Sequence, residues 1–314
     1  MESEKRKRDF LSTVGGLLAA AITANLLWGS ASTVIKLGYR YFNIPADDVM
    51  SVILFAGVRF TLAGALTILL GSLLRRRLLL PKRGSGGMIL ALALTQTVAQ
   101  YVFFYIGLAH APAFKGSIIS PTSTFFALLF AALVFRQEKL TPSKLIGCLI
   151  GFAGVLAVSL EGELDGGGIR LNGEGSLILA AASYGCSSVL IKRFSEHEDP
   201  IVLVGWQFLL GGALMTAAGL LGGGRLQASS PTAWALMGYL SLVSAVAYTL
   251  WSMLLQRYPV SRIVVFSFLN PVFGVVLSTL LLGEGKLLNV PRCLLAMVLV
   301  CLGVWIVNRP ERHA

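Results

Sequence analysis

The sequence predicts an all-α integral membrane protein with ten transmembrane helices, arranged as two inverted five-helix repeats. Three observations lead to this fold class. The 314 residues are 55% hydrophobic and only 13% charged, with a mean hydropathy of +0.77, which is more apolar surface than one soluble core can bury. Apolar stretches long enough to cross a bilayer recur along the whole chain. The second half also repeats residue patterns of the first.

The expected helices are apolar stretches of roughly 17 to 25 residues, the length that crosses the hydrocarbon core. The first follows the basic residues Lys5 to Arg8, but it is longer than the apolar part of a signal peptide and lacks a clean cleavage site, so we expect it to be retained. Short connections with turn residues, such as the glycines of 84–87 and 222–224, separate the stretches. The expected helices lie near 14–39, 51–73, 87–108, 113–135, 144–160, 175–192, 201–221, 232–255, 260–282 and 290–307.

The positions of the basic residues predict the orientation of the chain. Ten crossings place both termini on one side, and most of the 26 lysines and arginines fall in the loops of that side. Because such an excess marks the cytoplasmic face, we expect a multi-pass protein of the cell (inner or plasma) membrane with both termini in the cytoplasm. The formal charge of +11 therefore does not indicate nucleic-acid binding. The few cations expected on the other side are Arg40, Lys115, Arg170, Arg225, Lys286 and Arg292.

An internal duplication divides the chain. Residues 28–36 (WGSASTVIK) align without a gap on residues 184–192 (YGCSSVLIK). The alignment predicts a first five-helix repeat over 1–160, a linker over 161–175 and a second repeat over 176–314. Five is an odd number of crossings, so the second repeat must enter the membrane from the opposite face, and such inversion is typical of transporters. Further matched pairs are Arg59 with Gln207, Phe60 with Phe208, Gly64 with Gly212, Tyr101 with Tyr248, Pro112 with Pro259, and Glu138 with Glu284.

Both halves resemble the EamA-type repeat of the drug/metabolite transporter (DMT) superfamily over nearly the whole chain. The resemblance lies in the Trp-Gly-Ser start at Trp28, the lysine at Lys36, the Arg-Phe pair at Arg59, and the closing Gly-Glu before Lys286 and Leu287. It implies ten helices, cytoplasmic termini, and export or exchange of amino acids, nucleobase-like metabolites, nucleotide sugars or drugs. The first half departs from the pattern: it has Arg-Gln-Glu at 136–138, and Pro121 lies three residues before the position that matches Pro271.

Arg59 is the sharpest candidate for a substrate-binding residue. It lies in the middle of an expected span, where a cation costs on the order of 2.5 to 3.5 kcal/mol, and no Asp or Glu lies inside any span to pair with it. A guanidinium that faces an aqueous cavity binds a carboxylate or phosphate with two hydrogen bonds. The alternative is a structural role, in which Arg59 holds backbone carbonyls or a carboxylate at a helix end, such as Glu138.

Polar and aromatic residues recur at equivalent places in the two halves. Gln96 and Gln100 lie on one face of the third helix beside Tyr101, and Tyr248 and Trp251 answer them in the eighth. This grouping suits a pocket for a substrate with flat or apolar parts, although an aromatic belt or polar contacts between helices would give the same pattern. Lys36 can instead reach the outer surface along its apolar stem. The predicted substrate-binding residues are Arg59, Gln100, Tyr101, Tyr184, Tyr248, Trp251, Trp28, Lys36, Gln96 and Asn270.

Prolines 121 and 271 interrupt two expected spans. Each proline frees a backbone carbonyl, which carriers can expose at a site, and Asn270 would add its amide there. A kink satisfied by Ser120 and Thr122 is the simpler interpretation for Pro121.

The sequence offers no constellation for catalysis. Its three histidines lie outside the spans, its four cysteines lie apart inside them, and no phosphate-binding loop occurs, so we expect no enzyme activity, no cofactor and no metal. The sequence predicts a secondary transporter that moves small organic metabolites by alternating access. Its expected partners are the metabolite and the lipid bilayer, in which it would be a monomer or homodimer. A membrane-embedded enzyme or a channel is the alternative.

Overall fold

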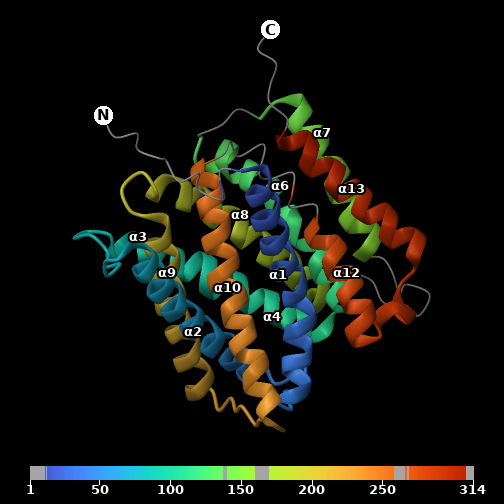
Figure 1. Ribbon diagram of the computed structural model, residues 1–314. Helices are drawn as coiled ribbons and strands as arrows, with labels where there is room; N and C mark the ends of the chain where they lie inside the picture. The colour runs from blue at the N-terminus through green and yellow to red at the C-terminus, as the bar shows by residue number, and fades with distance from the viewer. Residues whose placement is uncertain are drawn as a thin grey trace.

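Among the residues that the structure describes, eight helices are long and apolar enough to cross a membrane, whereas the sequence predicts ten such helices. This computed structural model describes residues 11, 13–136, 140–159, 170–257, 266 and 269–308, and these form the helical bundle of Figure 1 with no strand among them. The eight long segments are α1 (Val14–Tyr41), α2 (Val49–Arg75), α3 to α4 (Gly86–His110), α5 to η4 (Ala113–Val134), η6 and α8 (Leu171–Phe194), α9 (Pro200–Leu221), α10 (Pro231–Arg257) and α13 (Val290–Asn308).

Two further apolar helices are shorter, and they lie where the other two crossings were expected. These are α7 (Pro142–Ser159) and α12 (Leu269–Leu282). Each adjoins a stretch outside the described residues, so the expected ends of these spans, near 160 and 260, fall outside that part of the chain. The protein is therefore a multi-pass membrane protein.

Two long segments of the first half change their helical type along their length. The first consists of α3 (Gly86–Leu92), the π-helical turn η2 (Ala93–Ala99) and α4 (Gln100–His110). The second runs from α5 (Ala113–Ile119) through the 3₁₀ turn η3 (Ser120–Thr122) to α6 (Ser123–Leu129) and η4 (Phe130–Val134). Pro121 lies in η3, and the hydroxyls of Ser120 and Thr122 each donate to a preceding carbonyl at 2.6 Å. These hydroxyls donate to the carbonyls of Gly116 and Ile119, on either side of the carbonyl of Ser117, whose helical donor Pro121 lacks.

The packing of the helices follows the duplication. Helix α2 packs along α9, and α7 along α13, so each of these helices lies against its own repeat mate (Figure 1). Helix α1 packs against α10 and α12, while its mate α8 packs against α4 and α6, which are the mates of α10 and α12. Every major contact of one half therefore has a counterpart when the halves are exchanged.

Glycines allow the closest of these contacts. Gly64 of α2 and Gly212 of α9 are matched in the duplication, and a Cβ at Gly64 would overlap the backbone nitrogen of Leu209. A Cβ at Gly212 would likewise overlap the backbone nitrogen of Thr61. Small residues at such an interface let two helix backbones approach and gain dispersion energy in lipid, where the hydrophobic effect does not hold helices together.

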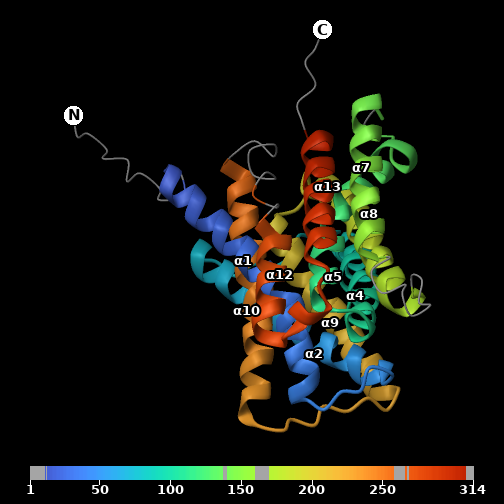
Figure 2. The same cartoon turned by 90° about the vertical axis from the view of Figure 1, so that its right-hand side faces the viewer.

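The two ends of the bundle can be told apart by the helix ends that lie there. The beginning of α1 and the end of α13 lie at one end in both views (Figures 1 and 2), which we call the terminal end. The opposite end, at which α1 ends and α13 begins, is called the distal end. Residues 284–287 form the short turn η8 (Glu284–Leu287), which joins α12 to α13 there.

Candidate functional site

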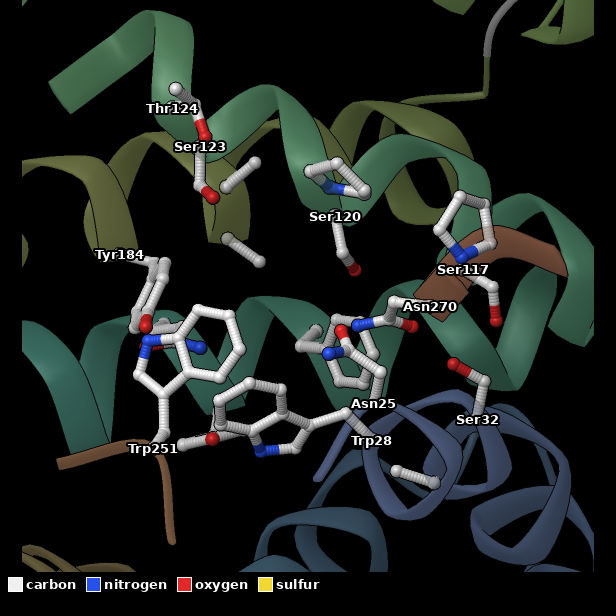
Figure 3. A pocket seen from close by; sticks show the side chains of 18 of the residues that line it. Asn25, Trp28, Ser32, Ser117, Ser120, Ser123, Thr124, Tyr184, Trp251 and Asn270 are labelled. Atoms are coloured by element: carbon white, nitrogen blue, oxygen red, sulfur yellow. The ribbon is translucent and has the colours of Figure 1, made fainter. Parts of the chain in front are cut away.

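A cavity of about 290 Å³ lies between the two halves. Its wall is built from α1, α2 and α4 to α6 of the first half and from α8, α10, α12 and α13 of the second. Figure 3 shows the rings of Trp28 and Trp251 together on one side, with Ser32, Ser117 and Asn270 gathered at the end away from Tyr184. The size is at the lower limit of pockets that bind small organic molecules.

The structure brings eight of the predicted residues together at this cavity. They are Arg59, Gln100, Tyr101, Tyr184, Tyr248, Trp251, Trp28 and Asn270. The wall also contains polar residues that sequence reasoning missed, among them Asn25, Ser32, Ser117, Ser123 and Ser244. Helical spacing was the available signal, because Asn25 lies three residues before Trp28 and Ser244 lies four before Tyr248, on the same helix faces.

Aromatic rings form one side of the cavity. The Trp28 ring meets those of Tyr248 and Trp251 edge-on, with centroids 5.4 and 5.2 Å away. The hydroxyls of Tyr101 and Tyr248, which are repeat mates, lie 3.2 Å apart and share a hydrogen bond across the two halves. Edge-to-face rings hold one another in fixed orientations, so this side of the cavity presents a pre-formed aromatic surface.

Arg59 is buried, with 3% of its surface exposed, yet it lines the cavity. Its Nε donates to the carbonyl of Leu240 at 3.2 Å and one terminal nitrogen donates to the hydroxyl of Ser244 at 3.0 Å. The other terminal nitrogen donates to the hydroxyl of Tyr105. The guanidinium also lies over the ring of Phe60, 4.7 Å from its centroid. Within the described part of the chain, its acceptors are thus a carbonyl and two hydroxyls, and it forms no ion pair with a carboxylate there.

Two side-chain amides at the cavity have hydrogen-bonding atoms without a partner among the described residues. The Oε1 atom of Gln100 is buried without a hydrogen bond, and Asn270 makes no side-chain hydrogen bond to any residue that the structure describes. Asn25 donates from Nδ2 to the carbonyl of Ala21 at 2.8 Å, which leaves its oxygen as an acceptor. Since a buried polar group without a partner is costly, these amides are suited to bind a ligand or ordered water.

Lys36 and Gln96 lie outside the wall of the cavity. The Nζ of Lys36 lies 3.4 Å from a carboxylate oxygen of Glu284. Gln96 accepts a hydrogen bond from the amide of Gln207, which is the residue matched to Arg59 in the second half. Glu138, the carboxylate considered for Arg59, lies outside the described residues.

The described residues contain no group of three His, Cys, Asp or Glu side chains that could hold a metal ion. The cavity wall offers a guanidinium, hydroxyls, amides and aromatic faces. Such groups bind a small molecule by hydrogen bonds and contact area, without a nucleophile paired to a base.

A bundle of membrane helices around a polar and aromatic cavity is the architecture of a membrane transporter. The chain belongs to the EamA-like transporter family, whose model matches residues 15–160 and 171–309, one match in each half. The assignment confirms the resemblance to this type of repeat and indicates a transporter rather than an enzyme.

Several curated relatives align over most of the chain. A protein of Salmonella typhimurium named "Probable amino-acid metabolite efflux pump" is 29% identical, over 87% of this chain and 89% of its own length. A protein of Escherichia coli with the same name is 27% identical over the same shares. The "Uncharacterized inner membrane transporter YedA" of Escherichia coli is 27% identical over 96% of this chain and 94% of its own. A crystal structure with a TM-score of 0.62 and 20% identity covers 94% of this chain and 96% of that chain, and it shares the fold.

Proposed function

We propose that this protein is a secondary transporter that exports small, amino-acid-like metabolites across the plasma membrane by alternating access. The observation that carries the proposal is the cavity at the seam of the two halves, where Arg59, the unpaired amide oxygen of Gln100 and a set of aromatic rings face the same space. The relatives named as amino-acid metabolite efflux pumps support the direction and the substrate class.

Arg59 supports a substrate with a carboxylate. A guanidinium carries five N–H donors, and the protein uses three of the donors of Arg59. At least one N–H on its terminal nitrogens is therefore left for a ligand. Among the described residues, the guanidinium of Arg59 has only neutral acceptors. A bound carboxylate would therefore supply the missing countercharge in a site of low dielectric.

The rest of the wall suits the other parts of such a molecule. The rings of Trp28, Trp251 and Tyr248 offer an apolar aromatic surface. The oxygens of Asn25, Gln100 and Asn270 would accept hydrogen bonds from an ammonium or amide group. An aromatic face also attracts an ammonium group. The cavity thus favours a compact, partly apolar molecule that bears charge at one end.

The arrangement of the halves supports alternating access. The contacts of one half recur in the other when the halves are exchanged, which supports ten spans in two inverted repeats that rock about the central cavity. The beginning of α1 and the end of α13 lie at one end of the bundle (Figure 2), and the excess of basic residues favours the cytoplasm for that side. The distal end then faces outward.

Thermal unfolding of the purified protein tests the proposal. A ligand that binds the folded state raises the melting temperature, so amino acids, nucleobases and cationic drugs can be compared directly. Flux of the best ligand into proteoliposomes should saturate and should deliver the unaltered molecule. Flux proportional to concentration would indicate a channel, and a chemically changed product would indicate an enzyme. If no metabolite of these classes shifts the melting temperature or is transported, the proposal is wrong.

A further inference from the structure

Glu284 connects three helices at the distal end. Its side chain is buried, with 6% of the residue exposed. The carboxylate accepts hydrogen bonds from the backbone nitrogen of Ala113, at 2.9 and 3.1 Å, and from that of Phe114 at 3.4 Å. It also accepts from the hydroxyl of Ser278 and lies 3.4 Å from Nζ of Lys36. One carboxylate therefore caps the start of α5 and holds the last turns of α1.

These contacts join the two halves. Glu284 and Ser278 belong to the second half, whereas Lys36, Ala113 and Phe114 belong to the first. A second buried pair lies nearby: Nζ of Lys115 is 2.7 Å from a carboxylate oxygen of Glu174, with side chains 6% and 9% exposed. The first turn of α5 is thus fastened at two points, to the second half by Glu284 and to the end of the linker by Glu174.

The fastened helices continue into the wall of the cavity. On α1, Ser32 lines the cavity one turn before Lys36, and on α5, Ser117 lines it one turn after Ala113. Between these levels, the side chains of Ile35 on α1 and Phe114 on α5 are buried. The charged cluster and these apolar side chains therefore lie between the cavity wall and the distal end.

We infer that Glu284 is a positioning residue that gates the cavity toward the distal side. Its contacts exist in the closed state, and they break when α1 and α5 move apart from α12. The chemistry suits a reversible joint, because water can replace the lost hydrogen bonds of a carboxylate, an ammonium and backbone N–H groups, so the net free energy of breaking them stays small. This inference rests on the proposed function, since a gate matters only in a carrier.

A cysteine in the cavity wall provides the test. Cys301 lines the cavity, and the other three cysteines can be replaced by alanine. In sealed vesicles of each orientation, the rate at which Cys301 reacts with a small, charged, membrane-impermeant methanethiosulfonate reports access from each side. We expect Glu284→Gln to raise the rate from the distal side at least about tenfold, since losing one charge-assisted hydrogen bond shifts a two-state equilibrium by about that factor. Lys36→Gln, which leaves the cap of α5 in place, should give a smaller increase.

The matched control is Asp199→Asn. Asp199 also forms an ion pair between the halves, with Arg75, but it caps α9 away from the cavity. An asparagine keeps the cap, so the distal rate should equal that of the parent.

An unchanged distal rate in both Glu284→Gln and Lys36→Gln, with normal reaction from the terminal side, would overturn the gate alone. If Cys301 failed to react from either side in every variant, the cavity would be sealed, and both the gate and the proposed function would be wrong.

Discussion

The hydroxyl groups of Tyr101 and Tyr248 lie 3.2 Å apart, although the two residues are 147 positions apart in the chain. They occupy equivalent places in the two halves, on α4 and α10. This hydrogen bond between matched residues links the two halves at the wall of the cavity. Phenylalanine at either position would remove this hydrogen bond and keep the aromatic ring.

Replacing either tyrosine by phenylalanine leaves the other hydroxyl without its partner. We expect Tyr101→Phe and Tyr248→Phe each to lower the free energy of unfolding, and the double variant to lose less than the two effects combined, with a coupling of about 0.5 to 1 kcal/mol. Unfolding of the four proteins in detergent measures this coupling. Strictly additive effects would show that the hydroxyls do not interact in the folded protein.

Arg59→Gln should reduce transport of a carboxylate substrate by about ten- to a hundredfold, because a hydrogen bond to a charged group contributes about 1.5 to 3 kcal/mol. Arg59→Lys should recover only part of the loss, since an ammonium cannot form the planar, two-bond contact. Flux in proteoliposomes, with the reconstituted amount of protein measured, provides the readout. Arg292→Gln, an exposed position, is the control for a lost positive charge. Full transport by Arg59→Gln would leave Arg59 a structural role only.

Gly64→Ala should destabilise the contact between α2 and α9. The added methyl would overlap the backbone of Leu209, and such overpacking costs about 1 to 3 kcal/mol. Gly238→Ala is the control, because nothing lies within 4 Å of a Cβ there. In that helix position alanine should stabilise slightly, by up to about 1 kcal/mol. Melting temperatures that fall equally in both variants would contradict this view of the interface.

Cys301 should be protected by substrate. It lies in the cavity wall, whereas Cys148 and Cys293 are buried elsewhere in the helix packing. A ligand found by thermal shift should slow modification of Cys301, and modification should in turn block transport. Protein with Cys301 as its sole cysteine allows both to be followed by mass spectrometry. A rate that does not respond to saturating ligand would place the binding site elsewhere.

The helices could be predicted because hydropathy and length decide them locally. Arg59 and the tyrosine pair were found since a cation in an apolar span is costly and because the duplication aligned the tyrosines. The sequence could not show that Lys36 and Gln96, unlike Arg59 and the tyrosine pair, lie outside the cavity wall. Their partners Glu284 and Gln207 are 248 and 111 positions away, and only the packed helices bring them together. Asn25 and Ser244 were missed because a small polar residue in a span serves packing as readily as binding.

Arg59 and Gln207 are equivalent positions with different chemistry. The two halves have matching glycines where they pack, but at this pair of positions only the first half carries a guanidinium. Under the proposed function, an anionic ligand would have a single anchor, on α2, and would not occupy the seam in two interchangeable orientations. If the halves rock as proposed, its head group would stay with the first half while its tail exchanges neighbours, so each crossing of the membrane would be a pivot about one fixed point.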